Sequence, residues 1–362
     1  MSDLNGWIAL SMVPDVGPVG ARKLLTVFGT PGKIFDADFD DLISIEGIGV
    51  QRARNIKAFS SWKEVDKNIA IMEKGRINAV LLGEPAYPEM LKEIEDAPVV
   101  LYTRGDILPE DRFAVAIVGS RKLTHYGASA AEVISEDLAS MGFTVVSGMA
   151  RGVDSISHRG ALKAGGRTFA VLGSGPDVPY PPENRTLMDA IADSGSIISE
   201  FPPGTPPDKE NFPRRNRLIS GLSLGVLVIE ATAGSGALIT ARYALEQGRE
   251  VFAIPGNITS PNSEGTNELI KKGAVLTRRA EDIVEELAPV LKGFIRGGKD
   301  KLKIEITDEE KSICSLLSGE PKQIDVISRE SGLPSSKILG ILLGLELKGV
   351  IKQITGKRFY LA

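Results

Sequence analysis

Cysteine and histidine are almost absent from this chain of 362 residues. Cys314 is the single cysteine, and His125 and His158 are the only histidines. A lone cysteine excludes an internal disulfide and a zinc site built from several cysteines. Two histidines also cannot supply a site with three or more histidine ligands. We therefore expect a protein without a bound metal.

Long apolar runs are absent as well. No stretch reaches the roughly 20 apolar residues that a membrane-spanning helix needs. Residues 1–10 show no basic region followed by a long apolar stretch, which is the pattern of a secretory signal. We expect a cytoplasmic protein that makes no contact with a membrane.

An excess of positive charge is the third missing feature. Lys and Arg number 43 against 47 Asp and Glu, which gives a net charge of −4. This balance excludes a protein that grips duplex DNA through a general positive coat. If the ligand is a nucleic acid, the cations that bind it must be gathered in one place.

Apolar runs that end near glycine or serine recur through the middle of the chain, with helix-like stretches between most of them. They are Ala114–Ser120, Phe143–Gly148, Thr168–Gly173, Ser196–Glu200, Gly225–Ala231, Val251–Gly256 and Ala274–Thr277. Continuous apolar strands separated by helices indicate a parallel sheet that is covered on both faces. We predict an α/β fold, with an extended Rossmann-like domain at residues 73–290 whose ligand lies at the carboxyl ends of the strands.

Two smaller domains are expected at the ends of the chain. Residues 1–72 have the pattern of short helices, with glycine turns at 15–25 and 45–56 that are typical of a SAM-like helix-hairpin-helix pair. Such hairpins bind phosphates through backbone N–H groups, but the nearby acidic residues leave a helical packing domain as the alternative.

A Gly- and Lys-rich linker is expected at 291–304. Residues 305–362 then predict three helices and a hairpin, which is a winged-helix arrangement. This segment has 8 Lys and Arg residues and 8 Asp and Glu residues. From Lys348 onward, however, the four cations at 348, 352, 357 and 358 face no acid, so the wing is mildly basic and gives weak evidence for DNA. Winged helices also serve as protein-interaction modules. A third possible function, a transcription regulator that binds duplex DNA, would depend on this domain alone.

The strand ends carry small and charged residues suited to phosphate. Gly119, Ser120 and Arg121 end the first strand, and Ser235 and Thr240 lie in a segment that opens a later helix. Backbone N–H groups at a helix N-terminus bind anions. Neither a Gly-Lys-Ser/Thr triplet nor G-x-G-x-x-G stands at these positions, so we expect no standard nucleotide cofactor. The alternative is a plain turn with an exposed arginine.

The densest positive patch lies between residues 209 and 217. It contains Lys209, Phe212, Arg214, Arg215, Asn216 and Arg217. Cations beside an aromatic ring suit a single strand, because the cations neutralise its backbone and the ring stacks on a base. The alternative is that Phe212 belongs to the core and that some arginines form ion pairs with Glu200 or Glu230.

One pair of residues has the spacing of a catalytic pair. Asp154 and His158 lie four apart at the start of a predicted helix and share a face. No serine or cysteine nucleophile accompanies them by spacing, so we expect them to hold the loop at 147–154 in shape. We expect no catalytic residue and no enzyme activity.

Several blocks of this sequence closely resemble the DNA-processing protein A (DprA/Smf) family. They are Gly119-Ser120-Arg121, Ser147–Asp154, Asn211–Leu222, Ser235–Arg242 and Gly265-Thr266-Asn267, with Tyr87-Pro88 and Leu101–Gly105 before them. The resemblance covers about residues 10–290, and the terminal domains are similar to additions found in many members.

The resemblance implies a protein that binds single-stranded DNA in its Rossmann-like domain. It implies that the protein protects incoming strands in natural transformation, forms a homodimer and helps to load the RecA recombinase. It also implies that Arg121, Lys209, Phe212 and residues 214–217 contact DNA. One departure is that Pro182 and Glu183 follow Tyr180-Pro181, so no cation is supplied there. A nucleotide-processing Rossmann-like hydrolase is the alternative, with Asp154, Glu200 and Glu230 as candidate carboxylates.

Overall fold

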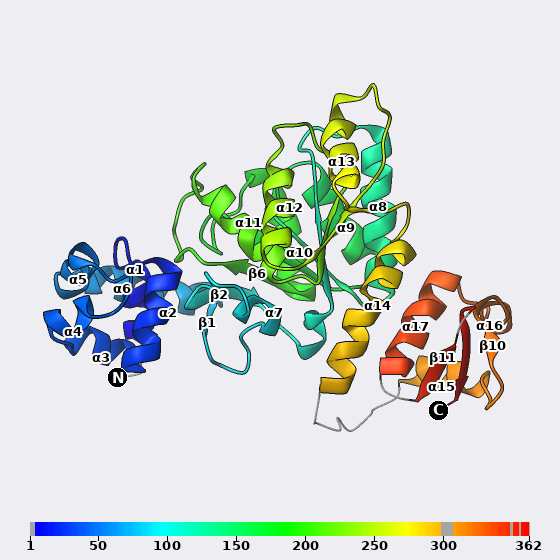
Figure 1. The fold of residues 1–362 in the computed structure, drawn as a ribbon, viewed down its shortest axis with the longest axis horizontal. Coiled ribbons are helices and arrows are strands. Elements are labelled where there is room, and N and C mark those ends of the chain that lie inside the picture. Colours follow the sequence, from blue (N-terminus) through cyan, green and yellow to red (C-terminus); the bar gives the residue numbers. More distant parts are fainter. Residues whose placement is uncertain (1–3, 298–306, 348–349, 355, 362) are drawn as a thin grey trace.

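A computed structural model describes residues 4–297, 307–347, 350–354 and 356–361 of the chain. Figure 1 shows three units in chain order: a cluster of helices, a large central sheet covered by helices, and a small unit that contains the C-terminus. No helix among the described residues is long and apolar enough to cross a membrane.

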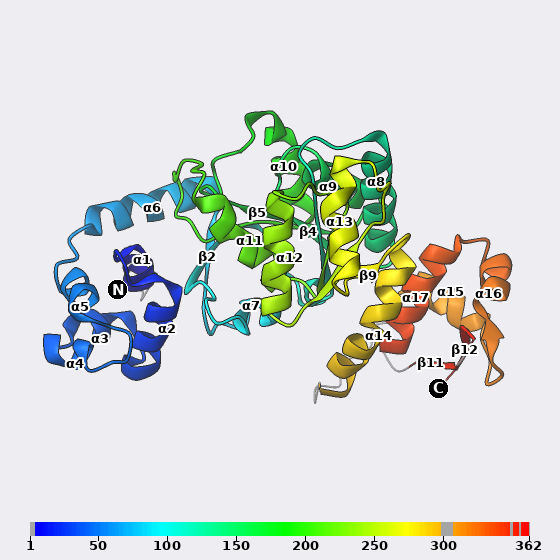
Figure 2. The same ribbon diagram turned by 45° about the horizontal axis from the view of Figure 1, so that its top comes forward.

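The first unit consists of short helices packed around one apolar core (Figure 2). Gly17, at the first position of α2, and Gly47, in the turn before α5, have φ values of 61° and 86°, so glycine supplies the left-handed backbone where each helix begins. Leu24, Leu42 and Ile56 are buried at its centre. The helices are α1 (Leu4–Met12), α2 (Gly17–Phe28), α3 (Pro31–Asp36), α4 (Phe39–Ile43), α5 (Val50–Lys57) and α6 (Trp62–Gly75).

The central unit is a 9-stranded sheet in the order β1-β2-β6-β5-β4-β3-β7-β8-β9. From β6 to β9 all neighbours are parallel, which confirms the predicted Rossmann-like sheet. The seven parallel strands are β3 (Ala114–Val118), β4 (Thr144–Ser147), β5 (Thr168–Leu172), β6 (Ser196–Ser199), β7 (Gly225–Val228), β8 (Glu250–Ala253) and β9 (Val275–Leu276).

Two further strands extend the sheet beyond the prediction. β1 (Asn78–Leu81) and β2 (Val100–Gly105) add antiparallel strands beside β6. In the chain, the short helix α7 (Glu89–Lys92) lies between these two strands, and the 3₁₀ turn η1 (Pro109–Arg112) precedes β3.

Helices cover both faces because successive side chains of a strand point to opposite sides. Val115 and Ile117 of β3 pack on the face covered by α8, α9 and α14, whereas Ala116 and Val118 pack on the face of α11 and α12. The helices are α8 (His125–Ser140), α9 (Val153–Lys163), α10 (Arg185–Ser194), α11 (Asn211–Gly221), α12 (Gly236–Glu246), α13 (Pro261–Lys271) and α14 (Ala280–Gly297), with the 3₁₀ turn η2 (Pro182–Asn184) before α10.

The order in which the chain adds strands reverses at β3. The chain proceeds from β3 to β4 on one side and later returns to pair β7 on the other. The loops that follow β3 and β7 therefore diverge at the carboxyl edge, and such a switch point is where open α/β sheets bind ligands.

The third unit has the predicted winged-helix arrangement of three helices and a hairpin. Its elements are α15 (Asp308–Ser315), β10 (Lys322–Gln323), α16 (Ile324–Ser331), α17 (Ser335–Leu347), β11 (Ile351–Ile354) and β12 (Arg358–Leu361). Thr307 and Glu310 form a capping box that starts α15. Ile338, Leu342 and Phe359 are buried in its core.

The first part of the expected linker is helical. α14 continues to Gly297, so residues 291–297 are helical and not an irregular connection. Residues 298–304 of that expected linker lie outside the described residues. The helix continues because Ile283, Leu287 and Leu291 lie at helical spacing and are buried against the sheet.

Candidate nucleic-acid interface

The loop after β3 holds the first three predicted residues. A Cβ added to Gly119 would lie 2.6 Å from Val153 Cγ2, so glycine lets the β3 loop approach α9 closely. The Ser120 hydroxyl donates to the Lys122 carbonyl at 2.6 Å and accepts from its N–H at 3.1 Å. Arg121 is exposed and has no ion pair among the described residues. Ser120 thus shapes the turn, whereas Arg121 is available to a ligand.

Arg215 lies beneath this loop and not on the surface. It is 4% exposed, and its Nη1 donates to the carbonyl of Gly148 at 2.8 Å and to that of Val171. Burial lowers the pKa of Arg215 to about 10, while nearby Asp154 opposes this shift. Arg215 therefore ties α11 to the carboxyl ends of β4 and β5, and its position argues against the expected contact with DNA.

Arg217 is held in a buried ion pair. Its Nη2 lies 2.5 Å from Glu200 Oε2, and its Nε lies 3.2 Å from Asp96 Oδ2. Burial raises the pKa of Glu200, and the charge of Arg217 offsets that rise. The ion pair with Glu200 is the structural alternative that the sequence left open. Like Arg215, Arg217 is placed to support the site rather than to meet a ligand.

Phe212 lies at the start of α11 between the core and the surface. A Cβ added to Gly173 would lie 2.8 Å from its Cδ1, so the ring packs directly on the loop after β5. Its centroid is 5.4 Å from that of Tyr180, and the Arg121 guanidinium lies 5.8 Å from the Phe212 centroid. That distance is within the range of a cation–π contact. The structure thus joins two predicted residues, Arg121 and Phe212.

Tyr180 is the aromatic residue that the predicted set lacks. It is 36% exposed, and its ring is inclined by 34° to that of Phe212. The sequence carried a signal for it, because Tyr180-Pro181 follows the glycine loop at 173–175 after a predicted strand. Spacing alone did not place it beside Phe212, which lies 32 residues later.

Lys209 and Arg214 are two further exposed cations, on and just before α11. Neither forms an ion pair within the part of the chain that the structure describes, and the Arg214 guanidinium lies 5.4 Å from the Phe201 ring centroid. The exposed acids Asp208 and Glu210 flank Lys209. We use the name basic-aromatic surface for Arg121, Tyr180, Lys209, Phe212 and Arg214.

The start of α12 lies beside the basic-aromatic surface. Asn216 Nδ2 donates to the Gly236 carbonyl at 3.4 Å, which links α11 to this turn. Ser235 caps the helix by accepting from the Ala237 N–H at 3.3 Å. A Cβ on Gly234 or Gly236 would meet nothing within 4 Å, so a ligand can approach this backbone. Thr240 is 2% exposed and is turned into the protein, away from such a ligand.

The candidate carboxylates are all occupied by protein groups. Asp154 is buried and accepts from the Ala150 N–H at 3.2 Å, which shapes the loop after β4 as expected. Burial raises the pKa of Asp154, and Arg215 opposes this rise. Glu230 accepts from the Thr124 N–H at 3.0 Å and from the Thr124 hydroxyl at 2.5 Å. Glu200 is paired with Arg217 through Oε2, and its other oxygen, Oε1, is buried.

His158 supports β5 and, within the described part of the chain, forms no hydrogen bond or ion pair with Asp154. Its Nδ1 lies 2.7 Å from the Thr168 hydroxyl, which itself donates to the Val145 carbonyl. Nδ1 must therefore be the protonated nitrogen. Burial lowers the pKa of His158 to about 3, so the ring is neutral near pH 7. A proton-transfer pair with Asp154 is not formed.

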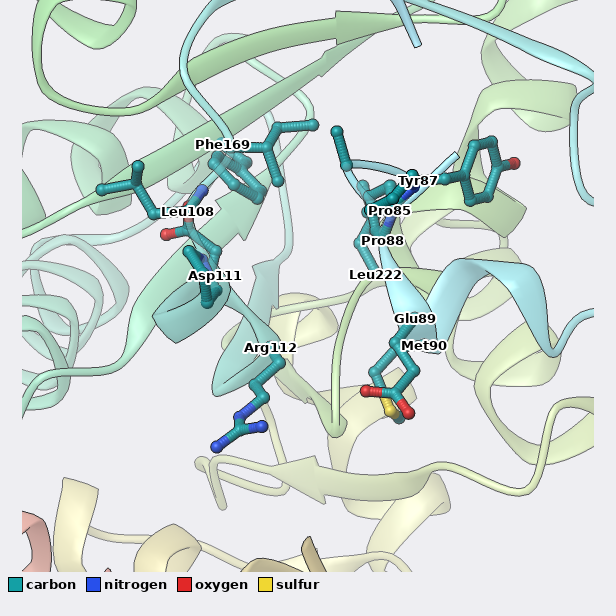
Figure 3. A pocket seen from close by; sticks show the side chains of 13 residues that line it. Pro85, Tyr87, Pro88, Glu89, Met90, Leu108, Asp111, Arg112, Phe169 and Leu222 are labelled. Atoms are coloured by element: carbon teal, nitrogen blue, oxygen red, sulfur yellow. The ribbon is translucent and has the colours of Figure 1, made fainter. Parts of the chain in front are cut away.

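A cavity of about 250 Å³ lies at the opposite edge of the sheet (Figure 3). Its lining is mixed, with apolar side chains such as Met90, Phe169 and Leu222 beside the charged residues Glu89 and Arg112. Asp111, on the same wall, is bound by Arg167 at 2.7 Å. The cavity shares no residue with the basic-aromatic surface. Among the described residues, no three His, Cys, Asp or Glu side chains are grouped as metal ligands.

Comparison with known families matches all three units. Residues 78–288 match the family model of DNA recombination-mediator protein A. Residues 299–357 match the DprA winged helix domain, and residues 8–59 match a SAM-like helix-hairpin-helix tandem.

Individual relatives agree with these matches. Protein Smf of Escherichia coli is 37% identical over 320 residues, which cover 86% of this chain and 84% of the relative. The solved structure of DNA processing protein A from Streptococcus pneumoniae has a TM-score of 0.66 at 35% identity, covering 78% of this chain and 97% of that one. The protein of that name from Helicobacter pylori, whose structure addresses its single-stranded DNA binding mode, has a TM-score of 0.54 at 31% identity over 59% of this chain and 97% of that one.

Proposed function

Because the chain belongs to the DNA recombination-mediator protein A family, we propose that it binds single-stranded DNA along the carboxyl edge of its parallel sheet. The observation that carries this proposal is the basic-aromatic surface. There, the guanidinium of Arg121 lies 5.8 Å from the Phe212 ring, and Tyr180 lies beside the same ring. The Helicobacter pylori relative, with its single-stranded DNA binding mode, supports this assignment.

The chemistry of this surface suits an unpaired strand. Exposed Arg121, Lys209 and Arg214 can each neutralise a phosphate, and a ring such as that of Tyr180 or Phe212 can stack on a base for about 1–3 kcal/mol. A duplex keeps its bases stacked inside and offers only its backbone. The surface therefore favours a single strand, and it does so without reading the sequence.

The two buried arginines, Arg215 and Arg217, lie beneath the basic-aromatic surface and support it. Arg215 holds the ends of β4 and β5, and Arg217 holds the end of β6 through Glu200. They fix α11, which carries Phe212 and Arg214, relative to the sheet edge. The open backbone at Gly234–Gly236 offers N–H groups to a further phosphate, since the first turn of a helix lacks acceptors for them.

We place this binding in natural transformation. In this proposal the protein works in the cytoplasm as a homodimer, covers incoming single strands and so protects them, and helps to load the RecA recombinase onto them. Membership in a family of DNA recombination mediators supports this role. Nuclease digestion of a labelled strand tests the protective step, because bound protein should slow the digestion.

Catalysis is not part of the proposal. A nucleotide hydrolase would need a carboxylate aimed at a substrate, but Asp154, Glu200 and Glu230 are buried or bound to protein groups. The geometry therefore favours binding without turnover.

The test is a competition between DNA forms. A labelled single strand is bound to the protein and displaced by unlabelled single strand or by unlabelled duplex, and free nucleotides are incubated in parallel. We expect the single strand to displace the label at a concentration at least tenfold lower than the duplex, with no product from nucleotides or strands. Equal displacement by both competitors, or product formation, would contradict the proposal.

A further inference from the structure

The third helix of the winged-helix unit has an unusual composition for its position. In DNA-binding relatives of the helix-turn-helix type, the corresponding helix enters the major groove and contacts base edges with Arg, Lys, Asn or Gln. α17 (Ser335–Leu347) has no Arg, Asn or Gln, and its charged residues are Lys337 and Glu346. Lys337 lies 2.8 Å from Glu309 in its own unit. The helix therefore has little with which to read DNA.

The apolar side chains of α17 instead pack on two sides, against the core of the winged-helix unit and against the central unit. Ile338, Leu342 and Leu345 are fully buried in the core of the winged-helix unit. Leu339 packs against that core and also against the core formed by α8, α14 and the sheet. The helix contacts both α8 and α14, and Figures 1 and 2 both show it beside α14.

Gly340 marks the point of closest approach. A Cβ at this position would lie 2.5 Å from Met141 Cα and 3.1 Å from the Met141 carbonyl oxygen. Both atoms belong to the backbone that follows α8, so no side-chain movement can relieve the clash. Glycine is required here because the two backbones touch.

The wing meets the central unit as well. Lys357, in the turn between β11 and β12, lies 2.5 Å from Glu285 of α14. The cation at the tip of the wing is thus directed at a carboxylate of the protein. The third helix and the Lys357 tip of the wing therefore both contact the central unit, whereas Lys352 and Arg358 on the strands of the wing are exposed.

We propose that the winged-helix unit is a docking module that binds the α8–α14 face of its own chain through α17 and the wing, and that it is not a reader of duplex DNA. This assignment does not depend on the basic-aromatic surface. Met141 follows α8 and precedes β4, so the docked face lies toward the amino edge of the sheet, away from the carboxyl edge that carries Arg121.

A pair of glycines in α17 provides a matched test. Gly340→Ala and Gly344→Ala each add one methyl group to the same helix. At Gly344 the nearest atom is Glu310 Oε1 at 3.3 Å, a side-chain oxygen within the winged-helix unit and not part of the central unit. The two variants therefore differ in whether they disturb the contact with Met141.

Hydrogen exchange of the full chain measures the docking, with small-angle scattering as a second readout. Gly340→Ala should raise the exchange rate of the amides at Leu138–Met141 at least tenfold and increase the radius of gyration, while amides in the core of the winged-helix unit stay protected. Gly344→Ala should behave as the unmodified protein does.

A charge exchange at the wing gives a second test that does not touch the core. Lys357→Glu should raise exchange in α14 severalfold, and the double variant Lys357→Glu/Glu285→Lys should restore it. The proposal is overturned if Gly340→Ala matches Gly344→Ala, if added duplex DNA protects the amides of α17 in the unmodified protein, or if the protection depends on protein concentration, which would place the contact between copies.

Discussion

Four cations stand close together in the sequence before and within α11, and their surroundings divide them into two pairs. Lys209 and Arg214 are exposed, whereas Arg215 and Arg217 are buried and bound by backbone carbonyls or carboxylates. Composition predicted the patch but not this division, because a buried arginine needs partners that lie far away in the sequence. Helical spacing does indicate that Arg215 is buried, since Arg215 shares a face with Leu218, Ile219 and Leu222.

Replacing Arg217 should destabilise the protein. Arg217→Ala leaves the buried Glu200 carboxylate without its partner, and breaking a buried ion pair typically costs about 3–5 kcal/mol. Urea unfolding at pH 8 should show this loss. The double variant Arg217→Gln/Glu200→Gln should recover most of it, since no lone charge remains.

The loss in Arg217→Ala should also depend on pH. Burial raises the pKa of Glu200, and removing Arg217 takes away the charge that lowers it. The folded variant then binds a proton on Glu200 that the unfolded chain has already released, so its stability falls as pH rises. We expect a smaller loss at pH 5 than at pH 8, and an equal loss at both would contradict this account of Glu200.

His158 predicts a pH dependence of the opposite sign. Its pKa in the folded protein is about 3, below its ordinary value of 6.5. As pH falls below 6.5, the unfolded chain takes up a proton that the folded chain does not, so stability is lost by up to about 1.4 kcal/mol per pH unit. His158→Gln should remove this part of the slope between pH 6 and pH 4. An unchanged slope in a folded His158→Gln protein would show that the histidine is protonated in the native state.

At the scale of elements, the sequence correctly predicted the strands and helices that apolar runs mark. The parallel strands and the three helices of the winged-helix unit follow from pattern and turn residues alone. β1 and β2 were missed because they are antiparallel additions, and the exposure of β1 is irregular. The start of the expected linker is helical, because apolar side chains at helical spacing continue through Leu291.

The contact between the loops after β3 and β4 should be sensitive to a single methyl group. Gly152 has a φ of 82°, and its Cβ would lie 2.3 Å from the Ser120 carbonyl oxygen. Gly152→Ala should therefore cost at least about 1–3 kcal/mol from backbone strain alone. Because the displaced loop carries Arg121, affinity for a single strand should fall too.

Gly234→Ala is the matched control for that experiment. Its added Cβ meets nothing within 4 Å, so thermal unfolding should be close to that of the unmodified protein. If Gly152→Ala were equally stable, the two loops would not be in the close contact that positions Arg121.

At the scale of the whole molecule, the basic-aromatic surface and the winged-helix unit lie at opposite edges of the sheet. The carboxyl edge carries the basic-aromatic surface, whereas the winged-helix unit contacts the end of α8 and α14. This separation could not be predicted from sequence, because balanced charge in residues 305–362 suited DNA and protein equally.

Deleting residues 305–362 should therefore leave binding of a single strand nearly unchanged. The removed unit holds none of the residues of the basic-aromatic surface, so we expect the Kd to stay within about threefold, a difference below 1 kcal/mol. Fluorescence anisotropy with a labelled strand measures it, and circular dichroism checks the fold. Loss of binding in a folded truncated protein would move the main site out of the central unit.

The most direct test of the central claim is the salt dependence of single-strand binding in three variants. A single strand releases counterions with a slope of about −0.7 in log K against log salt for each phosphate contacted. Arg121→Ala and Lys209→Ala should lower affinity for every sequence and make the slope shallower by about that amount. Phe212→Ala should lower affinity by about 1–3 kcal/mol and leave the slope unchanged, because a stacked ring releases no counterions. Folded Arg121→Ala and Lys209→Ala proteins that keep the affinity and slope of the unmodified protein would contradict the account.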